Sequence, residues 1–121
     1  MKFLVMVTMT PQIEANLKPT KEAFEKMGAF NETLTKDGVL LDMGGLHPTS
    51  KAVRIDYSGD KPRTIDGPFT ESKEVVAGFW MLQARSKEEV VERLLHCPFE
   101  LGENVEIRQM YEPEEVAELF K

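Results

Sequence analysis

The residues best suited to chemistry gather around the turn Asp66-Gly67-Pro68-Phe69. Glycine accepts backbone angles that other residues avoid and proline fixes the next angle, so the turn predicts a rigid corner with Asp66 in an Asx-type bond. We expect Phe69 to be anchored in the core and Asp66 to lie at the mouth of a cleft. There Asp66 could act as a general base or as a hydrogen-bond acceptor. The competing interpretation is that the motif is a structural turn and nothing more.

Several side chains near this turn in the sequence could complete a site. Glu71 and Lys73 follow the turn directly, where they either line the cleft or form solvated ion pairs. His47 and Arg54 could orient a substrate or stabilise its charge, and Trp80 could form an apolar wall. The predicted catalytic residues are therefore Asp66 and His47. The predicted substrate-binding residues are Arg54, Phe69, Glu71, Lys73 and Trp80.

The sequence lacks the usual motifs for metals, phosphates and dinucleotides. His47 and His96 are far apart, and Cys97 has no partner in a Cys-x-x-Cys pattern. Gly44-Gly45 lacks the later glycine of a dinucleotide fingerprint, and no nucleophile elbow is present. We therefore expect no metal and no cofactor. A single cysteine cannot form an internal disulfide, which suits the reducing cytoplasm.

The net charge and the hydropathy of the sequence argue against nucleic acid and membranes as partners. The formal net charge is −6, from 21 acidic and 15 basic residues, and no basic stripe is present, which argues against nucleic-acid binding. Apolar runs such as 3–7 are far too short to span a membrane. The 121 residues, 41% hydrophobic and 30% charged, fit one globular domain over 1–121 that ends in a short helix over 113–121.

The periodicity of apolar residues and the signals for helix ends predict the helices and strands that must position these residues. Pro19 suits a first helical turn and Gly38 a helix end, whereas Ser86-Lys87-Glu88-Glu89 is a capping box. Residues 11–17 read as a connection. The expected strands cover 2–8, 39–46, 52–57, 63–66, 75–84 and 105–111, and the two main helices cover 19–36 and the stretch from Ser86 to Cys97-Pro98.

Each main helix is expected to bury one apolar stripe. The first stripe comprises Ala23, Phe24, Met27, Phe30 and Leu34, and the second comprises Val90, Val91, Leu94 and Leu95. The order β-α-β, hairpin, β-α-β predicts an α+β, ferredoxin-like split βαβ domain with an antiparallel sheet and helices on one face. Because the other face needs a cover, we predict a homodimer with two sheets packed face to face.

The motifs also carry a resemblance. The Asp66 to Phe69 turn with Glu71, Lys73 and Glu74, followed by Gly78-Phe79, Cys97-Pro98 and Val105-Glu106-Ile107-Arg108, resembles the DGPF branch of the YCII-related family. The resemblance implies a ferredoxin-like fold that dimerises into an α+β barrel, and no established activity. Some YCII relatives are similar to muconate-type dehydrochlorinases, with a His-Asp pair near the first helix. Here Met27 occupies the expected histidine position, so that dyad cannot be transferred.

The sequence is compatible with two kinds of function, one directed at a small molecule and the other at a protein partner. The first is a small-molecule enzyme for proton abstraction or elimination, or a binding protein, with its pocket between sheet and helices near the dimer seam. The second is a non-catalytic regulatory or sensing module. The resemblance implies an extracytoplasmic-function sigma factor as one partner of such a module. The amphipathic segment 113–121 could contact that partner, its own domain or its dimer mate.

Overall fold

A four-stranded antiparallel sheet forms the centre of the computed structural model, which describes residues 1–121. The strand order is β2-β5-β1-β6. The long central strands pair along their length, with Val5 opposite Trp80 on one side and Ile107 on the other. The strands are β1 (Lys2–Met9), β2 (Leu40–Gly45), β5 (Val75–Gln83) and β6 (Asn104–Gln109).

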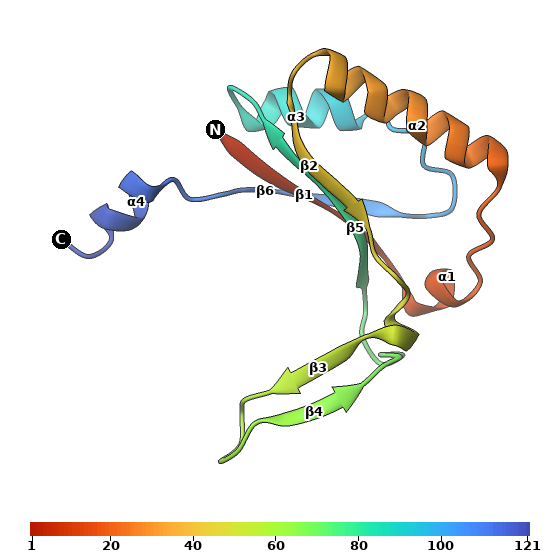
Figure 1. Ribbon diagram of the computed structural model, residues 1–121, viewed down its shortest axis with the longest axis vertical. Helices are drawn as coiled ribbons and strands as arrows, with labels where there is room; N and C mark the ends of the chain where they lie inside the picture. The colour runs from red at the N-terminus through yellow and green to blue at the C-terminus, as the bar shows by residue number, and fades with distance from the viewer.

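Two helices, α2 (Lys21–Lys36) and α3 (Lys87–Leu94), cover the same face of this sheet (Figure 1). This arrangement confirms the predicted α+β, ferredoxin-like fold. The hydroxyl of Thr20 caps α2 by accepting the Ala23 N–H, and Gly38 follows the helix with φ of 70°, a conformation that glycine adopts without strain. The predicted Ser86 cap also opens α3, where its hydroxyl accepts the Glu89 N–H. The reciprocal bond of a capping box is not made, because the Glu89 carboxylate accepts the N–H of Arg85 instead of that of Ser86.

The segment expected to be a connection contains a short helix, α1 (Pro11–Ala15). That expectation was wrong because the segment begins with residues that favour a helix N-terminus. The Thr10 hydroxyl accepts the Ile13 N–H at 3.2 Å, and Pro11 occupies the first helical position, where no N–H is needed.

The core lies between the sheet and the two covering helices. Phe3, Val5 and Leu82 of the sheet meet Leu34 of α2 and Val90 of α3, and all five are fully buried. The predicted stripes are wider than the buried ones. Phe24 is 79% exposed and Leu95 is 73% exposed, and Ala23 and Val91 are exposed too. Phe24 lies in the first turn of α2, at the end that runs away from the sheet (Figure 1).

The opposite face of the sheet carries no helix. Leu4 and Met6 alternate with the buried residues of β1, and their register partners Met81 and Phe79 alternate with those of β5. These four side chains form what we call the open face, defined as Leu4, Met6, Phe79 and Met81. They are half-buried because nothing in the chain covers them.

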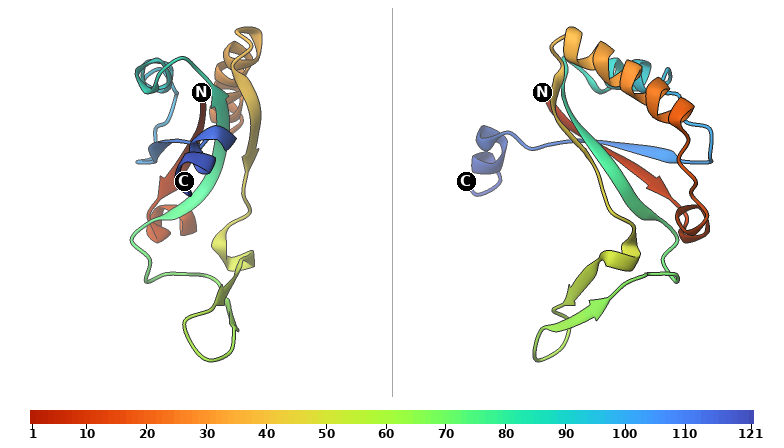
Figure 2. Two further views of the ribbon diagram at one scale, coloured as in Figure 1. Left: turned by 90° about the vertical axis from the view of Figure 1, so that its left-hand side faces the viewer. Right: turned by 45° about the vertical axis from the view of Figure 1, so that its right-hand side comes forward.

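Two arms project from the body on the side of the open face (Figures 1 and 2). The first is the predicted hairpin of β3 (Val53–Asp56) and β4 (Arg63–Asp66), which pairs only with itself and not with the main sheet. At its tip, hydrogen bonds from Ser58 and then Arg63 lower the pKa of Asp56 to about 2. The second arm is the terminal helix α4 (Pro113–Glu118).

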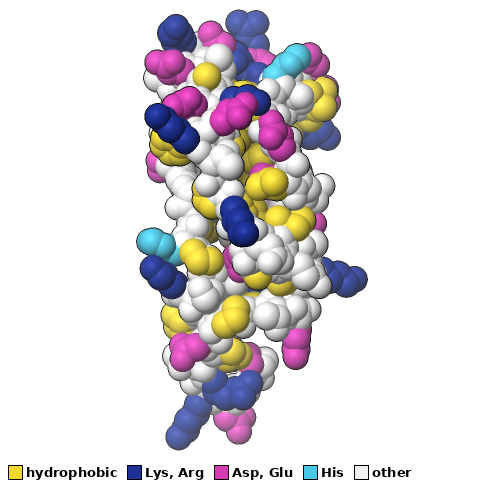
Figure 3. All heavy atoms as spheres, turned by 90° about the vertical axis from the view of Figure 1, so that its right-hand side faces the viewer, with side chains coloured by type: hydrophobic (Ala, Val, Ile, Leu, Met, Phe, Trp, Pro, Cys, Tyr) yellow, Lys and Arg dark blue, Asp and Glu magenta, His cyan; other side chains and the backbone are white.

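Charged side chains of both signs are interspersed on the face seen in Figure 3, with apolar side chains visible between them near its middle. None of the helices is both long enough and apolar enough to cross a membrane.

The buried and exposed members of the α2 stripe give a test of this core. Leu34→Ala should lower the free energy of unfolding by about 2–5 kcal/mol, because it leaves a cavity in a fully buried site. Phe24→Ala should change it by less than about 0.5 kcal/mol, because the ring is exposed. Urea denaturation measures both. Equal losses for the two variants would contradict this description of the core.

Candidate functional site

Asp66 ends strand β4 of the hairpin and is exposed to solvent. The Asx-type bond expected for it is absent, since the residue two positions on is Pro68, which has no N–H to donate. The Asp66 side chain makes no hydrogen bond within the chain. Instead, the N–H of Gly67 donates to the carbonyl of Ala52 at 2.9 Å, and the Gly67–Pro68 peptide bond is cis. The corner is therefore held by backbone rather than by the carboxylate.

Gly67 is required there by a close backbone approach. A Cβ atom on this residue would lie 1.7 Å from the carbonyl oxygen of Thr49, in the single 3₁₀ turn η1 (Thr49–Lys51). Glu14 of α1 holds the same turn, because its carboxylate accepts the Thr49 N–H at 3.1 Å and also the Thr49 hydroxyl. The motif thus joins α1, η1 and the base of the hairpin.

The structure brings two of the predicted substrate-binding residues together, but against each other. The Arg54 guanidinium lies over the Phe69 ring, 3.7 Å from its centroid, and donates to the Ser72 hydroxyl at 3.2 Å. Phe69 is half-buried beneath this cation and lies outside the core cluster, so its expected core position was wrong. Glu71 and Lys73 are exposed.

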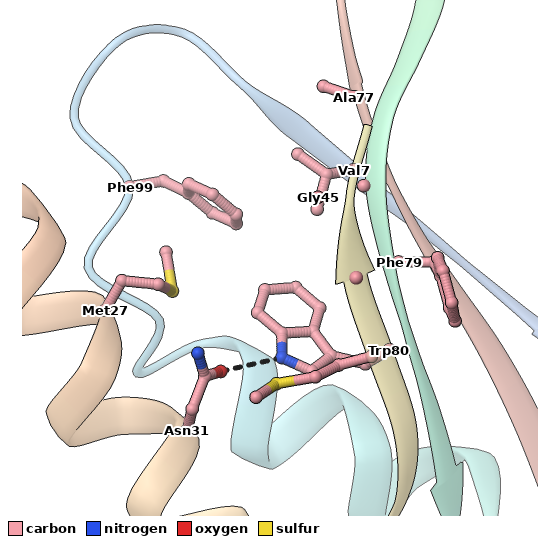
Figure 4. A pocket seen from close by; sticks show the side chains of 11 residues that line it. Val7, Met27, Asn31, Gly45, Ala77, Phe79, Trp80 and Phe99 are labelled. Carbon is pink, nitrogen blue, oxygen red and sulfur yellow. Dashed lines mark hydrogen bonds between the residues drawn. The ribbon is translucent and has the colours of Figure 1, made fainter. Parts of the chain in front are cut away.

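A second region of the molecule is hollow and has a mainly apolar lining. A cavity of about 420 Å³ lies between α2 and the β2–β5 side of the sheet (Figure 4). Trp80 is the one predicted site residue that lines it, whereas Asp66 and His47 do not. None of its eleven lining residues has a titratable side chain. Apart from the indole N–H of Trp80, its only polar side chain is Asn31.

Asn31 and Trp80 are joined across the cavity wall. The indole Nε1–H donates to the Oδ1 of Asn31 at 2.8 Å. Met27 lies one helical turn before Asn31, so both side chains face the sheet from α2. The Trp80 ring also meets Phe30 and Phe99 edge-on, with centroids 5.8 and 6.1 Å away. The indole is therefore fixed from three sides.

Glycines create the space on the sheet side. Gly45 of β2 pairs with Gly78 of β5, and both line the cavity. A Cβ atom on Gly78 would lie 2.9 Å from the Gly44 carbonyl oxygen, whereas one on Gly45 would meet no atom within 4 Å. The backbones of Gly44 and Gly78 therefore approach closely, and the empty space beside Gly45 belongs to the cavity.

Phe79 and Trp80 emerge from opposite sides of β5, as their adjacent positions predict (Figure 4). Phe79 belongs to the open face, and its Cε1 would lie 3.1 Å from a Cβ on Gly44. Since Phe79 also lines the cavity, the cavity extends to the edge of the sheet where the glycines leave the backbone bare. It therefore lies beside the open face.

The single cysteine, Cys97, lies next to this cavity, and its thiol is unreactive. The Cys97 Sγ is 3.9 Å from the Sδ of Met27. Burial, reinforced by the charge of Glu103, raises the pKa of the Cys97 thiol to about 12. A thiol with this pKa is protonated at neutral pH and is a poor nucleophile. No three His, Cys, Asp or Glu side chains gather as a metal-ligand group.

Comparison with known proteins shows one family model that covers most of the chain. The family model for the YCII-related domain matches residues 1–112. The chain belongs to the YCII-related family. An uncharacterised protein of Rhizobium meliloti (strain 1021) is 29% identical over 66 residues, which cover 54% of this chain and 53% of that protein. The chain spans about half the length of this curated relative.

One lining residue bears on the acid–base chemistry that the sequence resemblance raised. Met27 stands at the position where the resemblance led us to expect a histidine, and the structure places Met27 in the cavity wall. A thioether cannot take or give a proton, so this wall has no acid or base at that point.

Sequence reasoning missed Asn31, Phe99 and the role of Gly45. A signal for Asn31 was present, because an amide interrupts the apolar stripe of α2 between Phe30 and Leu34. A polar residue on a buried helical face needs a hydrogen-bonding partner, and the indole of Trp80 is that partner. Phe99 lies in the irregular segment between α3 and β6, where periodicity carries no information.

The close approach at Gly67 can be tested directly. Gly67→Ala should lower the free energy of unfolding by about 1–3 kcal/mol, because the new methyl group forces η1 away from the hairpin. Gly59→Ala, at the hairpin tip, is the control, because its Cβ would meet nothing nearer than 3.9 Å. Urea denaturation compares the two variants. A Gly67→Ala protein as stable as Gly59→Ala would contradict a structural role for the motif.

Proposed function

We propose that this YCII-related protein binds a small, uncharged and largely apolar molecule in the cavity beneath α2. The main support for this proposal is a cavity of about 420 Å³ whose lining contains no titratable side chain. Small-molecule sites typically combine an apolar lining with a few fixed polar groups, and here Asn31 and Trp80 supply those groups. A charged ligand would lose its hydration without gaining a partner of opposite charge.

The same lining favours binding over catalysis. Proton transfer needs an acid or base within hydrogen-bond reach of the substrate, and the cavity wall offers none. The nearby thiol of Cys97 is held protonated. Asp66, our candidate general base from the sequence, belongs to the hairpin and is not part of the cavity wall.

A substitution that fills the cavity tests this proposal. Gly45→Val should weaken binding of the neutral fluorescent probe 1-N-phenylnaphthylamine at least about tenfold, because its methyl groups would enter space that the protein leaves empty. Valine also suits a β-strand, so the fold should be retained. Gly28→Ala is the control, since its Cβ would meet no atom within 4 Å and Gly28 lies outside the cavity wall.

Fluorescence titration of the wild type and both variants gives the affinities, and circular dichroism verifies the fold. Wild-type binding that is lost in Gly45→Val and kept in Gly28→Ala supports the proposal. Equal affinity in all three proteins, or no binding to the wild type, contradicts it.

We also propose that the protein is a homodimer that buries the open face. Its accessible surface is 9090 Å². A compact monomer of its mass, 13.8 kDa, would expose about 6,600 Å². The excess exceeds the roughly 800 Å² that each partner buries in a standard interface.

The two arms account for part of that excess. Val53 and Ile55 share one face of the hairpin and are at least half exposed, and Leu119 and Phe120 beside α4 are 61% and 84% exposed. An isolated two-stranded hairpin is marginally stable in water, so the hairpin needs a surface to pack on. A two-fold axis across the open face would bring each arm onto the partner copy while the two sheets pack together.

The edge of the open face supports pairing with a like copy. Glu106 and Arg108 of β6 lie opposite Met6 and Leu4 in the register, so both signs of charge border the same apolar patch. Their own contact is long, at 3.9 Å, and exposed. In a two-fold arrangement, Arg108 of each copy can face Glu106 of the other, which makes the border self-complementary.

Sedimentation velocity tests the dimer. The wild type should sediment as a dimer at micromolar concentration, and Met6→Lys should raise the dimer dissociation constant at least about a hundredfold, because it buries an unpaired charge. Phe24→Lys makes the same chemical change on the helical side and should leave the dimer intact.

A wild-type monomer, or a Met6→Lys protein that still dimerises like Phe24→Lys, would contradict the proposal. A wild-type monomer would instead favour the alternative in which the arms and open face contact a different protein, such as an extracytoplasmic-function sigma factor.

A further inference from the structure

The side-chain amide of Asn31 has a fixed orientation. The oxygen and nitrogen of an amide are usually hard to distinguish, but the indole nitrogen of Trp80 can only donate a hydrogen bond. The atom that faces it at 2.8 Å must therefore be the carbonyl Oδ1. The Nδ2 group, with its two N–H donors, necessarily points away from the indole.

Those two donors are free within the chain. No hydrogen bond joins the Nδ2 of Asn31 to any other group of the protein, and this nitrogen remains accessible to solvent through the cavity opening or the surface. Figure 4 shows the nitrogen on the far side of the amide from Trp80, directed toward the space between Met27 and Phe99. Neither the Met27 thioether nor the Phe99 ring is a strong acceptor, so the wall opposite the amide does not satisfy it.

From this geometry we propose that the ligand is a neutral carbonyl compound with a flat apolar body, and that its carbonyl oxygen accepts a hydrogen bond from Asn31 Nδ2. The inference rests on the proposed function of the same cavity and adds the polarity of the ligand to it. A carboxylate is disfavoured because the wall contains no cation to compensate its charge.

The shape of the lining favours a planar body. The rings of Trp80 and Phe99 meet at 61° with centroids 6.1 Å apart, and they form an aromatic corner above the sheet. On the sheet side, Gly45 presents bare backbone with no atom where its Cβ would stand. A planar ring can lie against that backbone while its edge or face meets the two aromatic walls. Asn31 then fixes the orientation of the ring through its one polar substituent.

The ligand pair acetophenone and α-methylstyrene isolates the hydrogen bond. The two molecules have nearly the same shape, because a CH₂ group replaces the carbonyl oxygen. Their affinities differ in part because they leave water with different ease, so the informative quantity is the ratio of their dissociation constants in two proteins. Asn31→Asp keeps an oxygen for the Trp80 indole and removes the amide donor.

At pH 8, where the introduced carboxylate repels a carbonyl oxygen, Asn31→Asp should raise the ratio of the acetophenone to the α-methylstyrene dissociation constant about tenfold relative to the wild type. Gly28→Ala should leave the ratio unchanged. Isothermal titration calorimetry measures the four affinities and the control. An unchanged ratio in a folded Asn31→Asp protein overturns the inference.

The infrared carbonyl band of bound acetophenone keeps the test decisive if Asn31→Asp does not fold. In the wild type it should lie at lower wavenumber than in hexane, and an unshifted band overturns the inference.

The outcomes also separate the proposed apolar ligand site from the proposed hydrogen bond to a carbonyl group. If both probes bind and Gly45→Val excludes both, but the ratio and band show no hydrogen bond, then only the carbonyl assignment fails. If neither probe binds the wild type, both proposals fail.

Discussion

The hydrogen bond between Trp80 and Asn31 joins the helical layer to the sheet beside the cavity. It spans 2.8 Å and fastens the middle of α2 to the central strand β5. Without it, the buried indole N–H would lack a partner, at a cost of about 1–3 kcal/mol. The same bond sets the distance between helix and sheet at the cavity and fixes which end of the amide faces the interior. One contact therefore both stabilises the fold and gives the cavity its polarity.

Gly67 and Gly45 serve different purposes. At Gly67, glycine is needed because the backbone of η1 comes so close that no side chain fits. At Gly45, nothing occupies the place of a side chain, and the result is empty space beside Trp80 and Met27. Gly67 allows the hairpin arm to pack closely on η1, and Gly45 leaves space for the cavity. The Asp66 to Phe69 turn, which is conspicuous in the sequence, is thus separate from the residues that line the cavity.

Much of the fold could be predicted from the sequence, because local signals and tertiary structure agree. The Ser86 cap, Gly38 after α2 and the apolar run of β5 all specify elements that the structure contains. Phe24 shows where this reasoning fails, since periodicity indicates a face of the helix but not how far along that face the sheet extends.

The site was harder to predict because it depends on contacts between distant segments. Asn31 and Trp80 are 49 positions apart, and Phe99 comes from a third segment. The sequence alone favoured Asp66 because its motif combines a carboxylate with a well-defined turn. Asn31 was inconspicuous because a single amide in a helix has many ordinary explanations. The pairing of Gly45 with Gly78 likewise requires the strand register, which the residues alone do not give.

Nitrogen-15 NMR spectroscopy with added acetophenone observes the side-chain amide of Asn31 and the indole of Trp80 separately. If acetophenone binds in the cavity, it should shift the Asn31 Nδ2 protons and the backbone amide of Gly45, while the amides of Asp66 and Gly67 stay unchanged. Shifts confined to the corner around Asp66, with the Asn31 and Gly45 signals unmoved, would contradict binding in the cavity.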